Sequence, residues 1–455
     1  MVNLKVVEGT DTLALGPLLA ALSRALDLTE GQDMGHSVTA CLIALKIADV
    51  IGLSADERSN LHLAVLLKDA GCSSNASRMF EIFGGDDVMA KRESKFCNWC
   101  SFLEGARYAL THTAPHQLFT ERLLQMGKVM RVPGRVMDRL TEIRCERGAD
   151  IVRTLGLNEQ VATAVYSLDE HWNGRGAPHG LRRTEIPLLS RIACLAQTVA
   201  VFFTRFDREK ALFIAQRRSK TWFDPDLVQA LLSAESDIRF WDNLHRRPIE
   251  TLEAETVETL QRQVSSADLE SVCATFAAIV DAKSPFTAHH SRRVADYAVQ
   301  IGKVLGLSAT ERTDLHHAGL LHDLGKLGVP NLILEKPDKP TSEEWETIRR
   351  HPEWTARVLN GVPALSRLRD IAAAHHEKLD GSGYWRGLSG ERLDTAQRIL
   401  AVADMWDALT ADRPYRAGMS PEEALSILKK DAGRALDPDA VCALNHTPVE
   451  ISRAA

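Results

Sequence analysis

The sequence has 455 residues, of which 45% are hydrophobic and 25% charged, and its formal net charge is −6. This length and composition predict a soluble globular protein of two to three domains, and the acidic charge without a long lysine and arginine block argues against a nucleic acid polymer as partner. Because no apolar run reaches about 18 residues and the first residues do not resemble a signal peptide, we expect a cytoplasmic protein without a membrane contact.

The first part of the chain, residues 1–235, is expected to form a helical domain with an insertion at about residues 72–135. A segment that begins at Gly35, GHSVTACLIALKIADVIGLSADERSNLHLAVLLKDAG, has a helical pattern of apolar residues. The insertion contains Cys97 and Cys100, the only close pair among the eight cysteines. A single C-x-x-C motif is weak evidence for zinc, so most of these cysteines should be free thiols.

Residues 236–268 are polar and acidic with helical spacing, which predicts a helical linker whose apolar face would be compatible with a homodimer. The remaining part, residues 269–455, repeats the first part. Its segment from His289, HHSRRVADYAVQIGKVLGLSATERTDLHHAGLLHDLG, agrees with the segment from Gly35 at roughly half of the positions without a gap. Later segments also correspond: LDEHWNGRGAPHGL resembles HHEKLDGSGYWRGL, and RIACLAQTVA resembles RILAVADMWD. The sequence therefore contains a duplication.

Both copies have the pattern of helices. In the second copy, apolar residues recur at intervals of three and four through Val294, Tyr297 and Ile301. Thr341 followed by Glu344 predicts a helix start with a capping box. Because alternation typical of strands is scarce, we expect an all-α fold of two tandem helical bundles joined by a helical linker.

The second copy contains a series of residue types that bind metal ions. They are, in chain order, His290, His322, Asp323, His351, His375, His376 and Asp404. Imidazoles together with carboxylates suit iron, manganese or zinc, whereas calcium prefers oxygen. A single histidine is more often a core or surface residue than a ligand, but five in this order, with two doublets, indicate a metal centre.

The doublets favour two ions. Neighbouring residues on a helix point about 100° apart, so a doublet is better placed to straddle two ions than to grip one. Two ions at about 3.5–4 Å would be bridged by a carboxylate, the role we assign to Asp323, and would supply a bridging hydroxide for in-line attack on a phosphoryl group. One ion would take His290, His322 and Asp404, and the other His351, His375 and His376.

Lys326 follows the His322 and Asp323 doublet closely. Its ammonium group could contact a non-bridging phosphate oxygen and stabilise the charge that develops there. The alternative is a cation that satisfies the carbonyl end of a helix. Beside this doublet we favour the phosphate contact.

The motifs LLHDLGKLGVP, RRHPEWTARVL, HHEKLDGSGYWRGL and RILAVADMWDALTADRPYR resemble the HD superfamily of metal-dependent phosphohydrolases, and more narrowly its HD-GYP branch. The resemblance covers the second copy from about Asp281 to Leu444. It implies a helical bundle with a binuclear or trinuclear metal centre that linearises cyclic dinucleotides, chiefly cyclic di-GMP. It places the seven residues above on the metal positions and Lys326 on the phosphate-contacting position. It also places Tyr384, Arg413 and Arg416 near the substrate, although surface ion pairs explain the two arginines equally well.

Three positions depart from the family pattern. Phe286 stands where a third metal would take a glutamate, so we expect two divalent ions, iron or manganese. The Gly-Tyr-Pro signature reads Gly383, Tyr384 and Trp385. His289 replaces the glycine that usually precedes the first histidine of the family.

The first copy has lost most of these residues. It keeps His36 and Asp69 but has Lys68 in place of His322. We further pair Cys145 with His351, Leu168 and Asp169 with His375 and His376, and Gln197 with Asp404. The first copy should therefore not bind the two metals, which predicts either a regulatory or dimerising domain whose pocket binds an effector, or a purely structural domain.

These patterns together predict an enzyme, a binuclear metal phosphodiesterase that opens a cyclic dinucleotide, with cyclic di-GMP as the expected substrate. One alternative is a phosphohydrolase of the same type that acts on another nucleotide or small phosphoester. A different alternative is a non-catalytic receptor in which the metal-containing site binds the nucleotide and a protein partner receives the signal.

Overall fold

The computed structural model describes residues 14–98, 101–115, 119–131, 134–246, 248, 251–252, 264–287, 289–412 and 417–445. Over these ranges the chain folds into helices without any strand, and the only β-type pairing consists of isolated bridges. The predicted all-α fold is confirmed.

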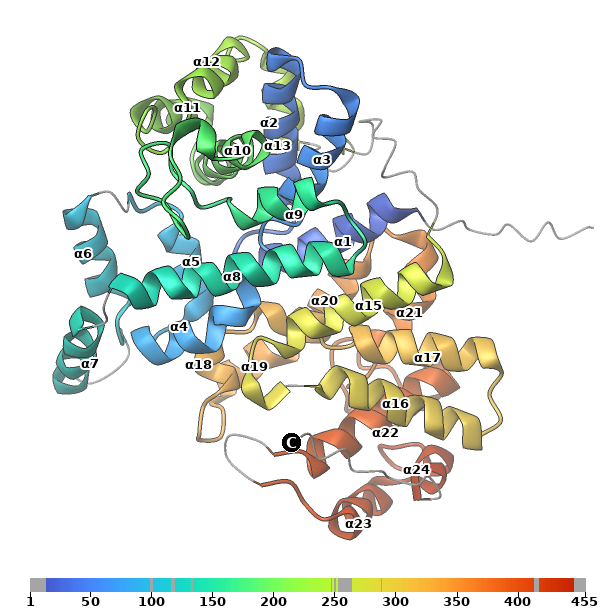
Figure 1. Ribbon diagram of the computed structural model, residues 1–455. Helices are drawn as coiled ribbons and strands as arrows, with labels where there is room; N and C mark the ends of the chain where they lie inside the picture. Colours follow the sequence, from blue (N-terminus) through green and yellow to red (C-terminus); the bar gives the residue numbers. More distant parts are fainter. Residues whose placement is uncertain are drawn as a thin grey trace, which may run out of the picture.

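The helices fall into the two copies of the repeat (Figure 1). Those of the first copy are α1 (Leu15–Thr29), α2 (His36–Ile51), α3 (Ala55–Leu66), η1 (Cys72–Asn75), α4 (Ala76–Phe83), α5 (Asp87–Ser94), α6 (Phe102–His112), α7 (Phe119–Arg131), α8 (Gly134–Thr154), α9 (Glu159–Tyr166), η2 (Arg183–Glu185), α10 (Leu188–Arg205), α11 (Arg208–Arg217), α12 (Pro225–Ser233) and α13 (Ile238–Arg246). Those of the second copy are α15 (Ser266–Asp281), η4 (Pro285–Thr287), α16 (His290–Val304), α17 (Ala309–Leu321), η5 (Leu324–Gly328), α18 (Asn331–Leu334), α19 (Ser342–Arg349), α20 (His351–Leu359), η6 (Pro363–Leu365), α21 (Ser366–Ala372), η7 (Gly390–Arg392), α22 (Thr395–Thr410), α23 (Pro421–Asp431) and α24 (Pro438–Asn445).

The helix signals read from the second copy are found in the structure. Val294 and Ile301 are buried on one face of α16, with Tyr297 partly buried beside them. Thr341 accepts a hydrogen bond from the backbone N–H of Glu344 at 3.3 Å, and the Glu344 carboxylate accepts one from the N–H of Thr341 at 2.6 Å. This capping box begins α19, as predicted.

The same local interactions recur in both copies. Glu170 accepts hydrogen bonds from the N–H groups nine and eleven residues further along the chain, and Glu377 accepts the corresponding pair. Ser54 and Ser308 each open the third helix of their copy with a capping box. The duplication seen in the sequence is therefore also a duplication of structure.

One pairing between the copies differs from the expected one. A Cβ atom added to Gly71 would lie 1.9 Å from the carbonyl oxygen of Arg144, and one added to Gly325 would lie 1.9 Å from that of His351. Since Gly71 corresponds to Gly325, the residue that corresponds to His351 is Arg144. The expected pairing with Cys145 was wrong by one residue, because the preceding insertion hides the register in the sequence. Glu170 and Glu377, the matching glutamates described above, are separated by the same number of residues as Arg144 and His351.

The two copies share one hydrophobic core, which runs from Leu15 in α1 to Leu444 in α24. Helix α1 packs on η5 and α20 of the second copy. Arg24 on α1 donates hydrogen bonds to the carbonyl oxygens of Val358, at 2.8 and 3.0 Å, and Asn360, at 2.7 Å. The last carbonyls of a helix have no partner within it, so Arg24 satisfies the end of α20 from the other copy.

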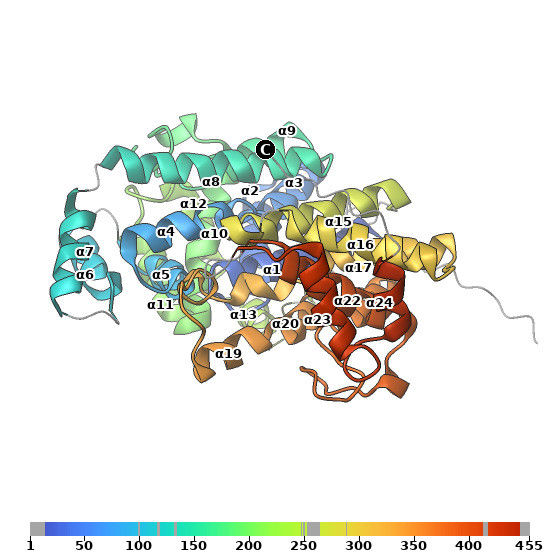
Figure 2. The ribbon, with the colours of Figure 1, turned by 90° about the horizontal axis from the view of Figure 1, so that it is seen from below.

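The insertion in the first copy forms α4 to α7. Figures 1 and 2 show α6 and α7 at one end of the molecule, away from the second copy. The remainder of the insertion contacts α18: the N–H of Asn331 donates to Asp87 at 2.7 Å, and the hydroxyl of Ser77 donates to Glu335 at 3.1 Å. Cys97 is a buried free thiol, and Cys100 lies outside the described residues.

The predicted linker, residues 236–268, is described only in part. It includes the first residues of α15 and also α13, which is grouped with the first copy above because its Trp241 packs against Phe203 of α10. Residues 247, 249–250 and 253–263 lie outside the described part. The division into residues 1–235, 236–268 and 269–455 stays a prediction.

Helix α10 lies at the centre of the first copy, against α2 and α11. By length and composition it is apolar enough to cross a membrane, but 72% of it is buried inside the structure. Its apolar side chains are therefore those of a core helix.

Candidate metal centre

The seven metal-competent residues of the second copy converge from five helices. They lie at the starts of α16 and α20, in the turns after α17 and α21, and within α22. In that order they are His290; His351; His322 with Asp323; His375 with His376; and Asp404. All except His376 are buried. Both doublets, expected inside helices, lie just beyond a helix end, where the turning backbone places the two side chains.

A close backbone approach brings the first doublet to α20. The absence of a side chain at Gly325 lets η5 contact the first residue of α20, His351. The N–H of Gly325 donates to the hydroxyl of Thr355 at 3.0 Å, and that hydroxyl donates to the carbonyl oxygen of His322 at 2.9 Å. These bonds fix the position of the doublet relative to His351.

Asp323 lies at the centre of the cluster. Its Oδ2 atom is 3.2 Å from Nε2 of His290 and 3.3 Å from Nε2 of His322. Its Oδ1 atom is 3.4 Å from Nε2 of His351 and 3.7 Å from Nε2 of His375. Each carboxylate oxygen thus faces a different pair of imidazoles, which is the arrangement that a carboxylate bridging two ions requires.

Asp404 faces the cluster from the other side. Its Oδ1 atom is 3.4 Å from Nε2 of His290 and 3.7 Å from Nε2 of His322, and its Oδ2 atom is 3.8 Å from Nδ1 of His376. The ligand atoms of two groups each lie within 4.8 Å of one another: His290, His322 and Asp404, and His351, His375 and His376. These match the two groups into which the sequence divided the candidates. A third group, His322, Asp323 and His375, meets the same distance limit and combines one histidine of each group with Asp323, so the division of ligands between two ions stays a prediction.

Three imidazoles are held in the form that a metal ion requires. Nδ1 of His322, His351 and His375 lies 2.6 Å from the carbonyl oxygens of Gly319, Ile348 and Ala372, respectively. Because a carbonyl can only accept, each Nδ1 carries the hydrogen and each Nε2 presents a lone pair to the cluster. Nε2 of His351 and Nε2 of His375 are only 3.0 Å apart. Two lone pairs at this distance repel each other, and a cation beside them would remove this repulsion.

Other buried atoms of the cluster lack a hydrogen bond. They are Nε2 of His290, Nε2 of His322 and Oδ1 of Asp323. Buried polar atoms are almost always hydrogen-bonded, and a bound ion explains a place where several are not. Burial also holds the pKa of His351 well below its usual value and lowers that of His375 to about 4, so both rings are neutral at pH 7. The residues therefore fit divalent metal ions.

Asp407 is a part of the site that the sequence reasoning missed. Its Oδ2 atom lies 2.6 Å from Nδ1 of His290, and its Oδ1 atom accepts a hydrogen bond from Arg293 at 2.6 Å. Asp407 follows Asp404 by three residues on α22, so both carboxylates lie on one helix face. The three-residue spacing of the two aspartates in ADMWD was the sequence signal that could have indicated this role of Asp407.

The residues expected to meet substrate lie partly at this site. The ammonium of Lys326 is 2.6 Å from Oδ2 of Asp323. The ring of Tyr384 lies beside that of His376, with centroids 4.7 Å apart, and the guanidinium of Arg349 lies 5.4 Å from the Tyr384 centroid. Arg413 and Arg416 lie outside the described residues. Arg349 is thus a further cation near the site that the sequence reasoning did not single out.

His289 has a backbone role. It precedes α16 with a φ of 60°, in the left-handed region, and Gly35 precedes α2 with a φ of 105°. Histidine is among the residues that adopt this conformation more often than most. The position therefore needs left-handed backbone, which explains why glycine is the usual residue there.

Comparison with known proteins gives concordant matches. The family model described as HD domain matches residues 135–227 and 274–440. The chain is 40% identical to 3'3'-cGAMP-specific phosphodiesterase 3 of Vibrio cholerae over 95% of this chain and 94% of that protein. It is 40% identical to the cyclic di-GMP phosphodiesterase response regulator RpfG of Xanthomonas campestris, over 33% of this chain and 41% of that protein.

A solved structure has the same overall fold. The crystal structure of the cyclic GMP-AMP-specific phosphodiesterase V-cGAP3 of V. cholerae superposes with a TM-score of 0.69 and 36% sequence identity. The match covers 96% of this chain and 99% of that chain. Both copies of the repeat are therefore part of the similarity.

Proposed function

The chain belongs to the HD-domain family of phosphohydrolases, in its HD-GYP branch, and on this premise we propose that it hydrolyses a phosphodiester bond of 3'3'-cGAMP at the centre around Asp323. The observation that carries the proposal is the buried convergence of imidazole nitrogens and carboxylate oxygens, three of which lack a hydrogen-bond partner. It occurs in a chain that is similar to a cyclic dinucleotide phosphodiesterase over 95% of its length. The family is metal-dependent, and two iron or manganese ions would complete the centre.

The division of ligands follows the two groups described above. One ion would be held by His290, His322 and Asp404, the other by His351, His375 and His376, and Asp323 would bridge them. Such ions activate water and stabilise negative charge on a phosphoryl group.

The chain's own groups orient this centre and the substrate. The carbonyl groups that accept from Nδ1 of His322, His351 and His375 hold the three rings with Nε2 toward the cluster. Lys326 lies at the edge of the cluster and is only partly exposed. Its ammonium group can leave Asp323 and bind a phosphate oxygen of the substrate instead. The ring of Tyr384, beside His376, is suited to stack on a base, and the guanidinium of Arg349, beside Tyr384, is suited to bind a phosphate.

The choice of substrate rests on the relatives. The relative that aligns along nearly the whole chain is named for 3'3'-cGAMP, whereas those named for cyclic di-GMP align over less than half of this chain. We therefore place 3'3'-cGAMP ahead of cyclic di-GMP, the substrate expected from the motifs. Trp385, in place of the family's proline, lies in the loop next to Tyr384 and differs from the signature of that branch.

The test is a competition assay. Protein reconstituted anaerobically with ferrous iron or with manganese is given equal amounts of 3'3'-cGAMP and cyclic di-GMP, and the linear products are separated by chromatography. We expect linear product mainly from 3'3'-cGAMP. A His322→Ala/Asp323→Ala variant should form none, whereas the matched change in the first copy, Lys68→Ala/Asp69→Ala, should leave turnover in place if the protein stays folded.

Each other result has a defined meaning. Faster cleavage of cyclic di-GMP would overturn the substrate assignment but keep the phosphodiesterase. Absence of both products from protein shown to hold two metals would favour another phosphoester as substrate or a non-catalytic receptor. Loss of activity in the first-copy variant only, with the second-copy variant active, would move the chemistry to the first copy.

A further inference from the structure

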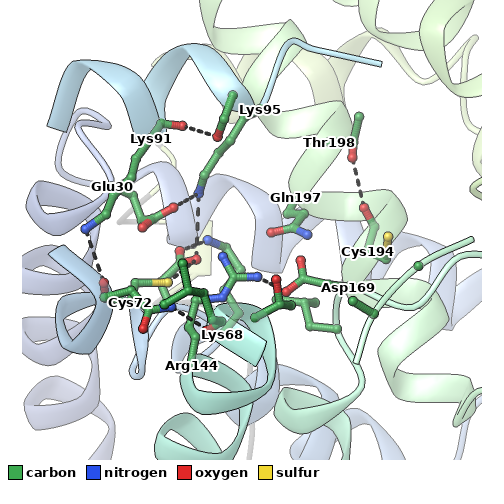
Figure 3. Close-up of a pocket in the computed structure, with 18 of the residues that line it drawn as sticks. Glu30, Lys68, Cys72, Lys91, Lys95, Arg144, Asp169, Cys194, Gln197 and Thr198 are labelled. Atoms are coloured by element: carbon green, nitrogen blue, oxygen red, sulfur yellow. Dashed lines mark hydrogen bonds and ion pairs between the residues drawn. The ribbon is translucent and has the colours of Figure 1, made fainter. Parts of the chain in front are cut away.

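The first copy contains a cavity at the place that corresponds to the metal centre (Figure 3). Its volume is about 460 Å³, within the range of about 300–1,000 Å³ that small-molecule sites occupy. Its lining includes the counterparts of His322, Asp323, His375, His376 and Asp404, which are Lys68, Asp69, Leu168, Asp169 and Gln197. The metal centre has thus been replaced by a space rather than by a packed core.

The cavity is open because ring side chains are missing from its wall. In the second copy, Tyr384 covers His376, with ring centroids 4.7 Å apart. The counterpart of Tyr384 in the first copy is Ala177, and the counterpart of His375 is Leu168. Ala177 and Leu168 both line the cavity.

Fixed cations stand where the second copy has imidazoles. Lys68 forms an ion pair with Asp69, and Arg144 forms one with Asp169. The side chain of Lys68 is fully buried. At the corresponding positions the second copy has His322, Asp323, His351 and His376. Two ion pairs therefore replace the proposed pair of metal ions.

A third cation reaches the same place from the insertion. The ammonium of Lys95, which follows α5, lies 2.9 Å from Glu30 and 3.7 Å from Asp69, and Figure 3 shows it directed toward this group. Glu30, Asp69 and Cys72 have ligand atoms within 4.8 Å of one another, as a metal site would. Because Lys95 and Lys68 already neutralise these carboxylates, a divalent cation would have to displace two ammonium groups.

The cavity as a whole favours an anion with an apolar part. Its cations are Lys68, Lys91, Lys95, Arg144 and Arg175, and its carboxylates are Glu30, Asp69 and Asp169. Lys91 is also paired with Asp87, a buried carboxylate outside the lining, at 3.7 Å, so one positive charge remains in excess. Lysine and arginine are the side chains that bind phosphate groups. The lining also includes apolar and aromatic side chains, among them Met79, Phe83, Tyr108 and Leu140, which we call the apolar wall. Such a wall suits a planar ring.

We propose that this cavity is a nucleotide-binding site, with the phosphate beside Lys95 and Arg144 and the base against the apolar wall. The site is separate from the centre around Asp323 and does not depend on what that centre hydrolyses. It gives the first copy a ligand-binding role in place of metal chemistry.

The experiment measures binding of radiolabelled AMP and GMP to the full-length chain by equilibrium dialysis. The chain carries Asp323→Ala and the buffer contains a chelator, so that the second copy contributes no metal-dependent binding. We expect one site per chain that binds AMP or GMP at least tenfold more tightly than it binds adenosine or inorganic phosphate. Ala177→Tyr, which restores the ring of the second copy, and Lys95→Gln, which removes a cation, should each weaken binding at least tenfold.

The matched control is Lys210→Gln, an exposed lysine of the same copy outside the cavity, which should leave the affinity unchanged. Circular dichroism melting identifies folded variants, and Ala177→Tyr decides the question if Lys95→Gln does not fold. Absence of AMP and GMP binding at millimolar concentration would overturn the proposal. Binding that both variants leave intact, or binding of phosphate as tight as that of AMP and GMP, would overturn it as well.

Discussion

At the scale of single residues, Asp407 controls the direction of His290. Its carboxylate joins Nδ1 of His290 to the guanidinium of Arg293, and it is almost fully buried. Burial opposes the ionised form, but hydrogen bonds from His290 and Arg293 outweigh it and lower the pKa of Asp407. The carboxylate therefore stays charged and keeps Nε2 of His290 directed toward Asp323.

Replacing Asp407 with asparagine should lower metal affinity or turnover by about 10- to 100-fold, the usual effect of removing a group that orients a metal ligand. Metal affinity by competition with a chelating dye separates this positioning role from a direct one, since it requires no substrate. Asp296→Asn, an exposed aspartate on α16, is the matched control and should change neither quantity. Normal metal affinity and turnover in Asp407→Asn would contradict the assigned role.

Gly325 is the second residue on which the centre depends, because its hydrogen occupies the space between η5 and the carbonyl oxygen of His351. Gly325→Ala should force these segments apart, at a cost of about 1–3 kcal/mol as for other overpacked positions, and should reduce bound metal. Gly105→Ala is the control, because a Cβ atom there meets nothing within 4 Å. Thermal melting and metal analysis of both variants provide the measurement, and an unchanged Gly325→Ala protein would refute the close-approach argument.

At the scale of elements, α1 connects the two copies. Arg24, inside α1, reaches the carbonyl end of α20, whose first residue is His351, and Glu30, just past the C-terminal end of α1, lines the cavity of the first copy. Leu28 lies near Gly328 at the end of η5, which carries Lys326. The same helix thus contacts the proposed nucleotide site and two segments of the metal centre.

Arg24→Ala should leave the carbonyl groups of Val358 and Asn360 without their donor and lower the free energy of unfolding by about 2–4 kcal/mol, because hydrogen bonds from a charged group are the stronger ones. Arg357→Ala, at an exposed position of α20, should change stability by at most about 0.5 kcal/mol. Denaturant unfolding of the two variants and the parent protein gives the comparison. Equal stability of all three would show that the contact between α1 and α20 contributes little.

The sequence predicted these elements unevenly. Helices such as α16 and α19 were predicted because their apolar spacing and caps are local signals, carried by residues such as Val294 and Thr341. The turns that hold the two doublets were expected as helix, since the contact of Gly325 with His351 is set by packing between distant segments. The pairing of Arg144 with His351 was missed for a related reason: the insertion removes the local register and only the fold restores it.

At the scale of the whole molecule, one duplicated scaffold carries two kinds of charge balance. In the second copy, imidazole lone pairs and carboxylates face one another and leave buried atoms such as Oδ1 of Asp323 without a hydrogen bond. In the first copy, Lys68 and Arg144 provide the positive charge themselves. Both arrangements lie around one shared hydrophobic core. The first copy therefore keeps the fold although it lacks most of the metal-binding residues.

The candidate site was largely readable from the sequence, because its histidines and aspartates stand in motifs of fixed order, such as LLHDLGKLG around His322. Asp407, Arg349 and Arg24 were not singled out, since each acts on a partner that only the folded chain brings near. The cavity of the first copy was anticipated only as a vacated pocket. Its cations include Lys95 from the insertion, which has no counterpart in the other copy.

The central claim is that metal ions belong to the second copy and fixed cations to the first. Anomalous diffraction from crystals of protein loaded with iron or with manganese, recorded above and below the absorption edge of the metal, tests it most directly. We predict two peaks, one on each side of Asp323, and none beside Asp69. A peak among Glu30, Asp69 and Cys72, or no peak at Asp323 in fully loaded protein, would contradict the account.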